Sequence, residues 1–546
     1  MFTRTVPLAL VAIAALAFGL YEAGAPGREQ RAIVRRYAAE WAHDDYRAMW
    51  ATLNTSSRRR VSEPEFAAEL SGAAQTATAS WLSAVRLLSI RGEEARVSFV
   101  VRTHVFGRLN EVLQIPLSGS GGGTRVVFNT SLLFPGLRSG ELLSRRTLIG
   151  RRGTLLADNG QPLAEGTSLA SPIPTVASAI AGTLGPIPAA QAAMYAQEGY
   201  PLGAKVGVDG LEEIFQRQLA GRLGGDLLAG TRVLASAKPG RGATVHSTID
   251  PTLEQDAIDA LGGKYGGITV INPHTGAIEA AAGIAFTSVQ PPGSTFKIIT
   301  ATAALAAGIT TPSTSYPYES SVYLDGFKMQ NAGGEVCGGT LTNAFATSCD
   351  TTFAPLGAQL GGAKLVSTAQ KFGFDRPTGI ASALESSIPA AAEIGSPLSV
   401  GDSAIGQGLV QASTLEMADV GATIADGGRR PLPTMVFGAK PRFVRVTTPK
   451  IAAEVQRMME AVVSYGTGTS AQIPGVNVAG KTGTAELRDT AGKVNDAKNT
   501  DAWFVGYAPV GDPKVVVCAL FPNQGYGAGT AAPAVRGVLE AALGLG

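Results

Sequence analysis

The sequence predicts a multidomain α+β protein. Its 546 residues are enough for about three domains, each with its own core. Near the C-terminus, residues 501–510 (DAWFVGYAPV) and 514–521 (KVVVCALF) are rich in Val and aromatic residues, which is typical of strands. The intervening Gly-Asp-Pro predicts a turn, and residues 530–543 have apolar positions at helical spacing. Strands and helices therefore share one domain here.

The N-terminal part shows the same mixture. Residues 28–53 and 63–76 predict two helices, while residues 95–105 and 125–133 alternate between apolar and polar positions and predict strands. A glycine-rich turn is expected at 119–123. From these patterns alone, this part is a generic small α+β module.

Composition excludes several function classes. The chain is 45% hydrophobic and 16% charged, as in ordinary globular proteins, and its net charge of +2 gives no reason to expect nucleic acid as a partner. Its four histidines fall outside any H-E-x-x-H or G-x-S-x-G pattern, so a zinc hydrolase or a histidine-based triad is disfavoured.

The first 25 residues predict a membrane anchor or a signal segment. Arg4 precedes an apolar run over residues 6–21, which is at the short end for a membrane span. Ala23-Gly24-Ala25 is also similar to a small-residue cleavage site, so a cleaved signal peptide stays open. In either case the bulk of the chain is exported.

A serine with a lysine one helical turn on carries the first chemical signal. Pro291 and Pro292 precede Ser294 and predict a helix start, where free N–H groups and the positive dipole end favour negative charge. Lys297, three residues on, shares a helix face with Ser294. An amine in a partly desolvated pocket loses proton affinity and can act as a base towards serine.

A second signal is the string KTGTAE, which begins at Lys481. Residues 475–482 (GVNVAGKT) also match the phosphate loop G-x-x-x-x-G-K-[ST], which needs a buried strand before it and a helix after it. Neither context is present, because the preceding residues 469–474 are polar and end in proline. Val476 and Val478 alternate as in a strand. We therefore expect Lys481 on a strand, in a sheet of at least three strands against which the serine helix packs.

Ser294-x-x-Lys297 with Lys481-Thr482-Gly483 resembles the motifs of penicillin-recognising serine enzymes, the penicillin-binding proteins and serine β-lactamases. The strings ITVINPHTG (268–276), SAIGQG (403–408) and DAWFVGYAP favour the penicillin-binding proteins. The resemblance implies an antiparallel sheet flanked by helices over residues 246–546.

The resemblance also assigns roles to residues. Ser294 would be the nucleophile, Lys297 its base, Ser348 a proton relay to the leaving amine, and Lys481 a positive charge for the substrate carboxylate. Thr482, Gly483 and Thr484 would contact the substrate. The backbone N–H groups of Ser294 and Thr484 would form the oxyanion hole.

One position departs from the family pattern. The family has Ser-x-Asn between the other two motifs, whereas this chain has Ser348-Cys349-Asp350. A carboxylate near Lys297 would favour the ammonium form and weaken the base. Asp350 could instead bind the substrate amide as asparagine would, or lie displaced from the site as a solvated side chain.

The three cysteines are Cys337, Cys349 and Cys518. Export permits disulfides, and Cys337 could pair with Cys349, twelve residues on, which would hold Ser348 in place. The alternative is three reduced cysteines, because pairing depends on a Cα geometry that sequence does not give.

Further strings extend the resemblance towards the N-terminus. RRTLIGRRGTLLADNGQPLAEG from Arg145 and GVDGLEEIFQRQLAGRLGG at 207–225 resemble the pedestal (dimerisation) domain of class B penicillin-binding proteins, which we place at 138–245. YAAEWAHDDYRAMWATL resembles the start of the nuclear-transport-factor-two-like domain of the methicillin-resistance penicillin-binding protein, which gives a domain over 26–137. No stretch resembles a glycosyltransferase.

The resemblance identifies the chain as a class B D,D-transpeptidase that cross-links peptidoglycan stem peptides ending in D-Ala-D-Ala and is acylated by β-lactams at Ser294. It implies a cell-membrane protein with one span and an extracytoplasmic catalytic domain, or a secreted one if the start is cleaved. It also implies a glycan-strand polymerase as partner, and no metal or organic cofactor. Two alternatives stay open: an impaired scaffold or β-lactam sensor, and a β-lactamase or D,D-carboxypeptidase.

Overall fold

The structure, a computed structural model, describes residues 27–119, 123–487 and 499–545. It confirms the α+β class. The predicted anchor segment, residues 1–25, lies outside the described residues. Within them, no helix combines the length and apolar character that a membrane crossing needs.

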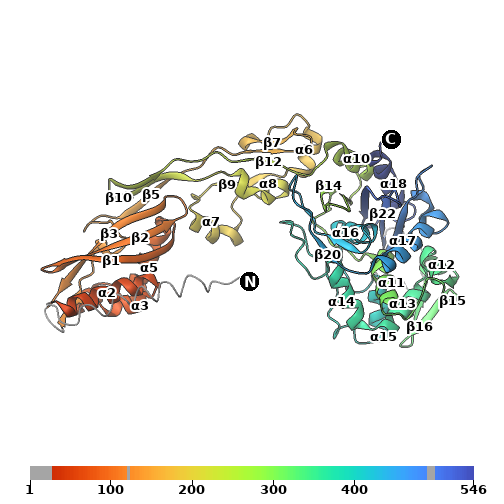
Figure 1. The fold of residues 1–546 in the computed structure, drawn as a ribbon, viewed down its shortest axis with the longest axis horizontal. Helices are drawn as coiled ribbons and strands as arrows, with labels where there is room; N and C mark the ends of the chain where they lie inside the picture. Colours follow the sequence, from red (N-terminus) through yellow and green to blue (C-terminus); the bar gives the residue numbers. More distant parts are fainter. Residues whose placement is uncertain (1–26, 120–122, 488–498, 546) are drawn as a thin grey trace. The chain divides into compact units, whose positions relative to one another are not determined.

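The chain forms two compact units (Figure 1). The stretch 138–245 contributes segments to both. The first unit extends to Arg152 and also includes Pro186–Lys205 and Ala220–Gly242. The second consists of Gly153–Gly185, Val206–Leu219 and the chain from Ala243 onward.

Helices followed by antiparallel sheets make up the first unit. Four strands pair in the order β1-β2-β3-β4, and three others in the order β11-β10-β5. Tyr37, Trp41, Phe66 and Phe99 fill the core between the helices and the first sheet. The elements of this unit are α2 (Arg28–Ala42), α3 (Tyr46–Ala51), α4 (Thr55–Arg60), α5 (Glu63–Thr76), β1 (Ala79–Arg91), β2 (Glu94–Thr103), β3 (Gly107–Ser118), β4 (Arg125–Val126), β5 (Leu143–Leu148), α7 (Ala192–Glu198), β10 (Gly224–Ala229) and β11 (Arg232–Ala237).

The helix predicted at 28–53 is interrupted. Asp44 has a φ of 57°, which ends α2, and the side chain of Asp45 accepts a hydrogen bond from Ala48 N at 2.9 Å, which begins α3. Aspartate favours both roles, because its short side chain competes for nearby backbone N–H groups. The prediction at 63–76 agrees with α5. Ser62 and Glu65 form a capping box at the start of this helix.

The strand predictions in this unit hold only in part. The expected strand at 95–105 corresponds to β2, but β1 and β3 were not predicted. At 125–133 only β4 is extended, because Asn129 accepts a hydrogen bond from Ser131 N and starts a 3₁₀ turn. Residues 120–122 of the expected glycine-rich turn lie outside the described residues.

The second unit is built on the main sheet, an antiparallel array of five described strands in the order β14-β13-β23-β22-β21. Its other strands and helices surround that sheet or form short hairpins. They are β6 (Thr154–Leu156), β7 (Pro162–Glu165), α6 (Pro174–Ile180), α8 (Gly210–Ile214), α9 (Gln216–Leu219), β12 (Thr244–His246), α10 (Pro251–Leu261), β13 (Gly267–Ile271), β14 (Ile278–Gly283), η5 (Gly293–Phe296), α11 (Lys297–Ala306), β15 (Ser315–Glu319), β16 (Ser321–Leu324), β17 (Phe327–Gln330), β18 (Cys337–Thr340), α12 (Leu341–Ala346), α13 (Asp350–Leu360), α14 (Gly362–Phe372), α15 (Pro397–Ala404), α16 (Thr414–Ala425), β19 (Arg429–Pro431), β20 (Phe443–Arg445), α17 (Pro449–Ser464), β21 (Ala479–Glu486), β22 (Thr500–Ala508), β23 (Val515–Phe521) and α18 (Ala531–Ala542). Strands β8 (Leu184–Pro186) and β9 (Lys205–Gly207) lie at the unit boundaries.

Helices cover both faces of the main sheet. Helices α10 and α18 pack on one face, and α16 and α17 on the other (Figure 1). Every residue of β22 and β23 is therefore buried, which explains why both strands, after the initial Thr500 and Asp501, are continuously apolar instead of alternating. The predicted strands at 501–510 and 514–521, the turn between them and the closing helix agree with β22, β23 and α18.

Strand β21 begins later than predicted. Val476 belongs to a tight turn bridged to Ile473, and the extended segment starts at Ala479. Alternating valines were a false signal here, because a turn of four residues also places β-branched side chains on the surface of the neighbouring core.

Glycines allow η5 to pack directly on β21. A Cβ on Gly483 would lie 2.7 Å from Pro292 O and 2.9 Å from Trp503 Cβ. Gly293 has a φ of 52°, and a Cβ there would lie 2.7 Å from Thr484 O. Both residues must therefore lack a side chain for the two segments to approach this closely.

We predict that Gly483→Ala destabilises the protein by about 1–3 kcal/mol, because the added methyl meets backbone that cannot move without separating η5 from β21. Thermal unfolding of the full chain measures the effect. Gly537→Ala is the matched control: Gly537 lies inside α18 with open space around its Cα, so its replacement should stabilise by about 0.5–1 kcal/mol. Equal effects of the two substitutions would contradict this account of the packing.

Candidate active site

Ser294 lies on a 3₁₀ turn, η5, that leads directly into α11. The turn packs on β21 beside Gly483 and Thr484, and Ser294 is half-buried while its neighbours Thr295 and Phe296 are fully buried. In the part of the chain that the structure describes, no hydrogen bond joins Ser294 Oγ to Lys297 Nζ. The predicted pair therefore lies on one turn without a hydrogen bond between the two side chains.

Lys297 is the first residue of α11 and has no solvent exposure. Its Nζ donates hydrogen bonds to Asp350 Oδ1 and to Ser348 O, each at 2.7 Å, and lies 3.4 Å from Ser348 Oγ. The ring of Phe353 lies below the ammonium, 5.6 Å away. All three donors of a buried ammonium thus face acceptors, as burial of a charge requires.

The connection between α12 and α13 carries Ser348 and Asp350. Ser348 has a φ of 62°, an uncommon conformation for a residue with a side chain, and Cys349 N returns to Ala344 O at 2.8 Å. This turn directs the carbonyl and hydroxyl of Ser348 towards Lys297. Asp350, the first residue of α13, is 8% exposed and lies on Lys297, so a displaced, solvated aspartate is not what the structure has.

Lys481 reaches the same point from β21. It is fully buried, and its Nζ donates to Ser348 Oγ at 2.8 Å and to Thr482 O at 3.1 Å. Because Lys481 lies inside a strand, with Gly480 and Thr482 in register with β22, the phosphate-loop alternative is wrong. Thr482, Gly483 and Thr484 line the edge of the main sheet next to η5.

Burial and charge act in opposite senses on the two amines. Burial lowers the pKa of Lys297, and the Asp350 carboxylate raises it in part. Burial lowers the pKa of Lys481 well below its usual range, and the neighbouring Lys297 charge lowers it further against the effect of Asp350. Two protonated amines are therefore disfavoured, and one of them can be a neutral proton acceptor.

The arrangement is suited to proton transfer around a nucleophilic serine. Ser348 Oγ stands between two amines, at 2.8 and 3.4 Å, so it can accept a proton from one and pass a proton on. Ser294 is accessible at the border of this cluster. In the described residues, no three His, Cys, Asp or Glu side chains are grouped closely enough to hold a metal ion.

Sequence reasoning missed Thr467. Its Oγ1 lies 2.5 Å from Thr482 Oγ1, and its backbone N donates to Ala346 O, two residues before Ser348. A Cβ on the preceding Gly466 would lie 2.2 Å from Ala346 O, so the Gly-Thr pair allows the close approach. No local pattern marks this contact, because it joins segments more than 100 residues apart.

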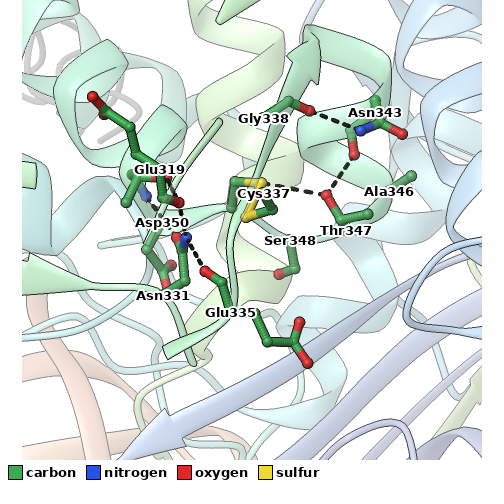
Figure 2. The surroundings of a disulfide bond; sticks show 12 residues. Glu319, Asn331, Glu335, Cys337, Gly338, Asn343, Ala346, Thr347, Ser348 and Asp350 are labelled. Carbon is green, nitrogen blue, oxygen red and sulfur yellow. Dashed lines mark hydrogen bonds between the residues drawn. A yellow bond between two sulfur atoms is a disulfide. The ribbon is translucent and has the colours of Figure 1, made fainter. Parts of the chain in front are cut away.

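The structure joins Cys337 and Cys349 by a disulfide, and Cys518 is free and buried in β23 (Figure 2). Cys349 lies between Ser348 and Asp350. The bond thus ties the turn that carries both residues to β18.

Comparison with known proteins places the site in a family context. The family described as "Penicillin binding protein transpeptidase domain" matches residues 266–540. The chain is 32% identical over 399 residues to the peptidoglycan D,D-transpeptidase PbpA of Mycobacterium tuberculosis, a match that covers 60% of this chain and 76% of that protein. It is 27% identical over 388 residues to the peptidoglycan D,D-transpeptidase MrdA of Haemophilus influenzae, covering 57% and 58%.

Solved structures give the same relationship. Penicillin-binding protein A from M. tuberculosis, solved as a penicillin G acyl-enzyme complex, is similar with a TM-score of 0.58 and 27% identity, over 72% of this chain and all of that one. The D,D-transpeptidase domain of a peptidoglycan glycosyltransferase from Eggerthella lenta is similar with a TM-score of 0.59 and 28% identity, over 72% and 99%.

Proposed function

The chain belongs to the penicillin-binding protein transpeptidase family, and we infer that it is a peptidoglycan D,D-transpeptidase that works through a serine acyl-enzyme and binds penicillin at the same serine. One observation supports this most: Lys297, Ser348 and Lys481 converge from three separate elements beside Ser294. The substrate is a peptidoglycan stem peptide that ends in D-Ala-D-Ala.

In the first half-reaction, Ser294 Oγ attacks the carbonyl carbon of the penultimate D-alanine. Its proton passes to neutral Lys297 Nζ, and the backbone N–H groups of Ser294 and Thr484 stabilise the developing oxyanion. When the peptide bond breaks, Ser348 Oγ passes a proton to the leaving nitrogen, and D-alanine departs. Thr482 and Lys481 hold the terminal carboxylate during this step.

In the second half-reaction, an acceptor amine attacks the ester carbonyl on Ser294. The amine loses a proton to the same relay, and Ser294 recovers its own. A β-lactam enters the first half-reaction in the same way, but its opened ring remains attached and blocks the acceptor.

The finer assignments rest on the resemblance. A class B architecture accounts for the pedestal strings, and a nuclear-transport-factor-two-like domain over 26–137 is consistent with helices followed by an antiparallel sheet in the first unit. A membrane anchor at the start would hold the catalytic domain outside the cell membrane, where a glycan-strand polymerase supplies its substrate.

Labelling of the full chain with fluorescent penicillin tests the function. We expect one label per chain, mapped to Ser294, that persists after excess reagent is removed, and Ser294→Ala should abolish it. Lys297→Ala should lower the acylation rate about 10²–10⁴-fold, because it removes the general base. A label released rapidly by hydrolysis would instead identify a β-lactamase or carboxypeptidase, and no label would identify a scaffold.

The Asp350 carboxylate gives a second prediction, on pH dependence. It raises the pKa of Lys297, so Asp350→Asn should lower that pKa and make the neutral amine available in more acidic solution. The rising, acidic limb of the acylation rate against pH should therefore move to lower pH. Asp512→Asn is the matched control, because Asp512 forms a 2.5 Å pair with Lys514 on the exposed surface. A limb that stays in place in Asp350→Asn would show that Asp350 does not act on the base.

A further inference from the structure

A small segment of the second unit, residues 315–340, braces the turn that carries Ser348 and Asp350. It contains two strand pairs, β15 with β18 and β16 with β17, and we call it the brace. The brace contacts α13, and it is also joined to residues 348–351 at two points (Figure 2). One is the disulfide from Cys337 to Cys349, and the other is the side chain of Asn331.

Asn331 is 5% exposed and uses its whole amide. Its Nδ2 donates to Glu319 O and to Glu335 O, each at 2.8 Å, and its Oδ1 accepts from Thr351 N at 2.9 Å. Figure 2 shows Asn331 between the two carbonyl groups, next to Asp350. The amide therefore joins two separate stretches of the brace to the first turn of α13.

The first turn of α13 needs this acceptor. The residue before the helix is Cys349, whose side chain is in the disulfide and makes no cap. An uncapped first turn leaves backbone N–H groups without partners. Asp350 stands in that turn, and aspartate readily accepts hydrogen bonds from N–H groups in the first turn of a helix.

Two partners thus compete for the Asp350 carboxylate. Thr352 N already donates to Cys349 O at 3.3 Å, so the N–H group in question is that of Thr351. If the Asp350 carboxylate turned towards it, the carboxylate would leave Lys297, which it now binds at 2.7 Å. Asn331 removes the competition because Thr351 N–H is already satisfied. The disulfide fixes the same turn on the side of Ser348, whose φ of 62° needs support from its surroundings.

We propose that Asn331 is a positioning residue for the transpeptidation reaction: it caps α13 so that Asp350 stays on Lys297 and Ser348 stays between the two amines. This inference rests on the function proposed above. Asn331 touches no reacting atom and acts only through Asp350 and Ser348.

Asn343 offers a matched control. Its Nδ2 donates to Gly338 O at 2.7 Å, so it also ties the brace to a helix, but that helix is α12 and the contact leaves α13 untouched. Asn331→Ala and Asn343→Ala each remove one buried or half-buried amide from the same small segment. They differ in whether the first turn of α13 loses its acceptor.

The test is the second-order rate of acylation by fluorescent penicillin, measured against pH on the full chain. Asn331→Ala should lower the maximal rate roughly ten- to hundredfold, because a small displacement of Ser348 disturbs the relay. It should also move the acidic limb to lower pH, since Lys297 loses its carboxylate; the titratable groups that face Lys297 among the described residues are Asp350 and Lys481. Asn343→Ala should stay within about threefold of the wild type.

Two further variants separate positioning from general loss of structure. Asn331→Asp loses both donors to the brace but keeps an oxygen for Thr351 N–H, so its acidic limb should not move to lower pH, and it also serves if Asn331→Ala fails to fold. In an Asp350→Asn background, Asn331→Ala should cause no further movement of the limb.

The proposal is overturned if Asn331→Ala and Asn343→Ala behave alike, if Asn331→Asp also moves the limb to lower pH, or if the limb moves further in the Asp350→Asn background. Absence of label on the wild-type chain would overturn the proposed function, and this inference with it. A labelled wild type with any of the first three outcomes would overturn this inference alone.

Discussion

The burial of two lysine amines around one serine hydroxyl is the constraint on which the site depends. Lys297 and Lys481 have no exposure to solvent, and each donates to Ser348. Removing an ammonium from water costs several kcal/mol per ion unless acceptors replace the water. The backbone carbonyls of Ser348 and Thr482, together with the Asp350 carboxylate, provide that replacement. The same burial lowers the pKa of both amines, which makes a neutral amine more available as a base.

That cluster forms only if three segments approach without intervening side chains. Gly293 and Gly483 let η5 lie directly on β21, and Gly466 lets the loop after α17 touch the end of α12. The continuous apolar cover on both faces of the main sheet keeps β21 in place while its edge stays available. The fold thus supplies a rigid edge. Among the described residues that bind the two amines, Ser348 alone has a positive φ.

Features of the site that depend on neighbouring residues were predictable from the sequence, whereas contacts between distant positions were not. Ser294 with Lys297 lies within one turn, and Lys481 lies on a strand with a marked composition, so spacing and propensity indicated a helix start and a strand. The resemblance to penicillin-recognising enzymes was needed to join them into one site. The contact between Lys297 and Asp350 joins residues 53 positions apart, and sequence left three possibilities for that aspartate open. The interruption after α2 had a local signal in Asp44 and Asp45, which helical periodicity outweighed. Asn331 had none, because its importance comes from two carbonyls and one N–H that only the folded chain brings together.

The aspartate in place of the family's asparagine changes the charge balance of the site. With asparagine, two buried amines would face each other without a compensating negative charge. Their mutual repulsion would then favour loss of a proton from one of them. The Asp350 carboxylate pairs with Lys297 and reduces this repulsion, and it raises the pKa of both amines. One contact therefore sets both the cost of burying Lys297 and its strength as a base, so a substitution at position 350 cannot change one without the other. Asn331 and the disulfide carry no charge and act on the position of this contact, so they change the strength of the base only by moving the Asp350 carboxylate relative to Lys297.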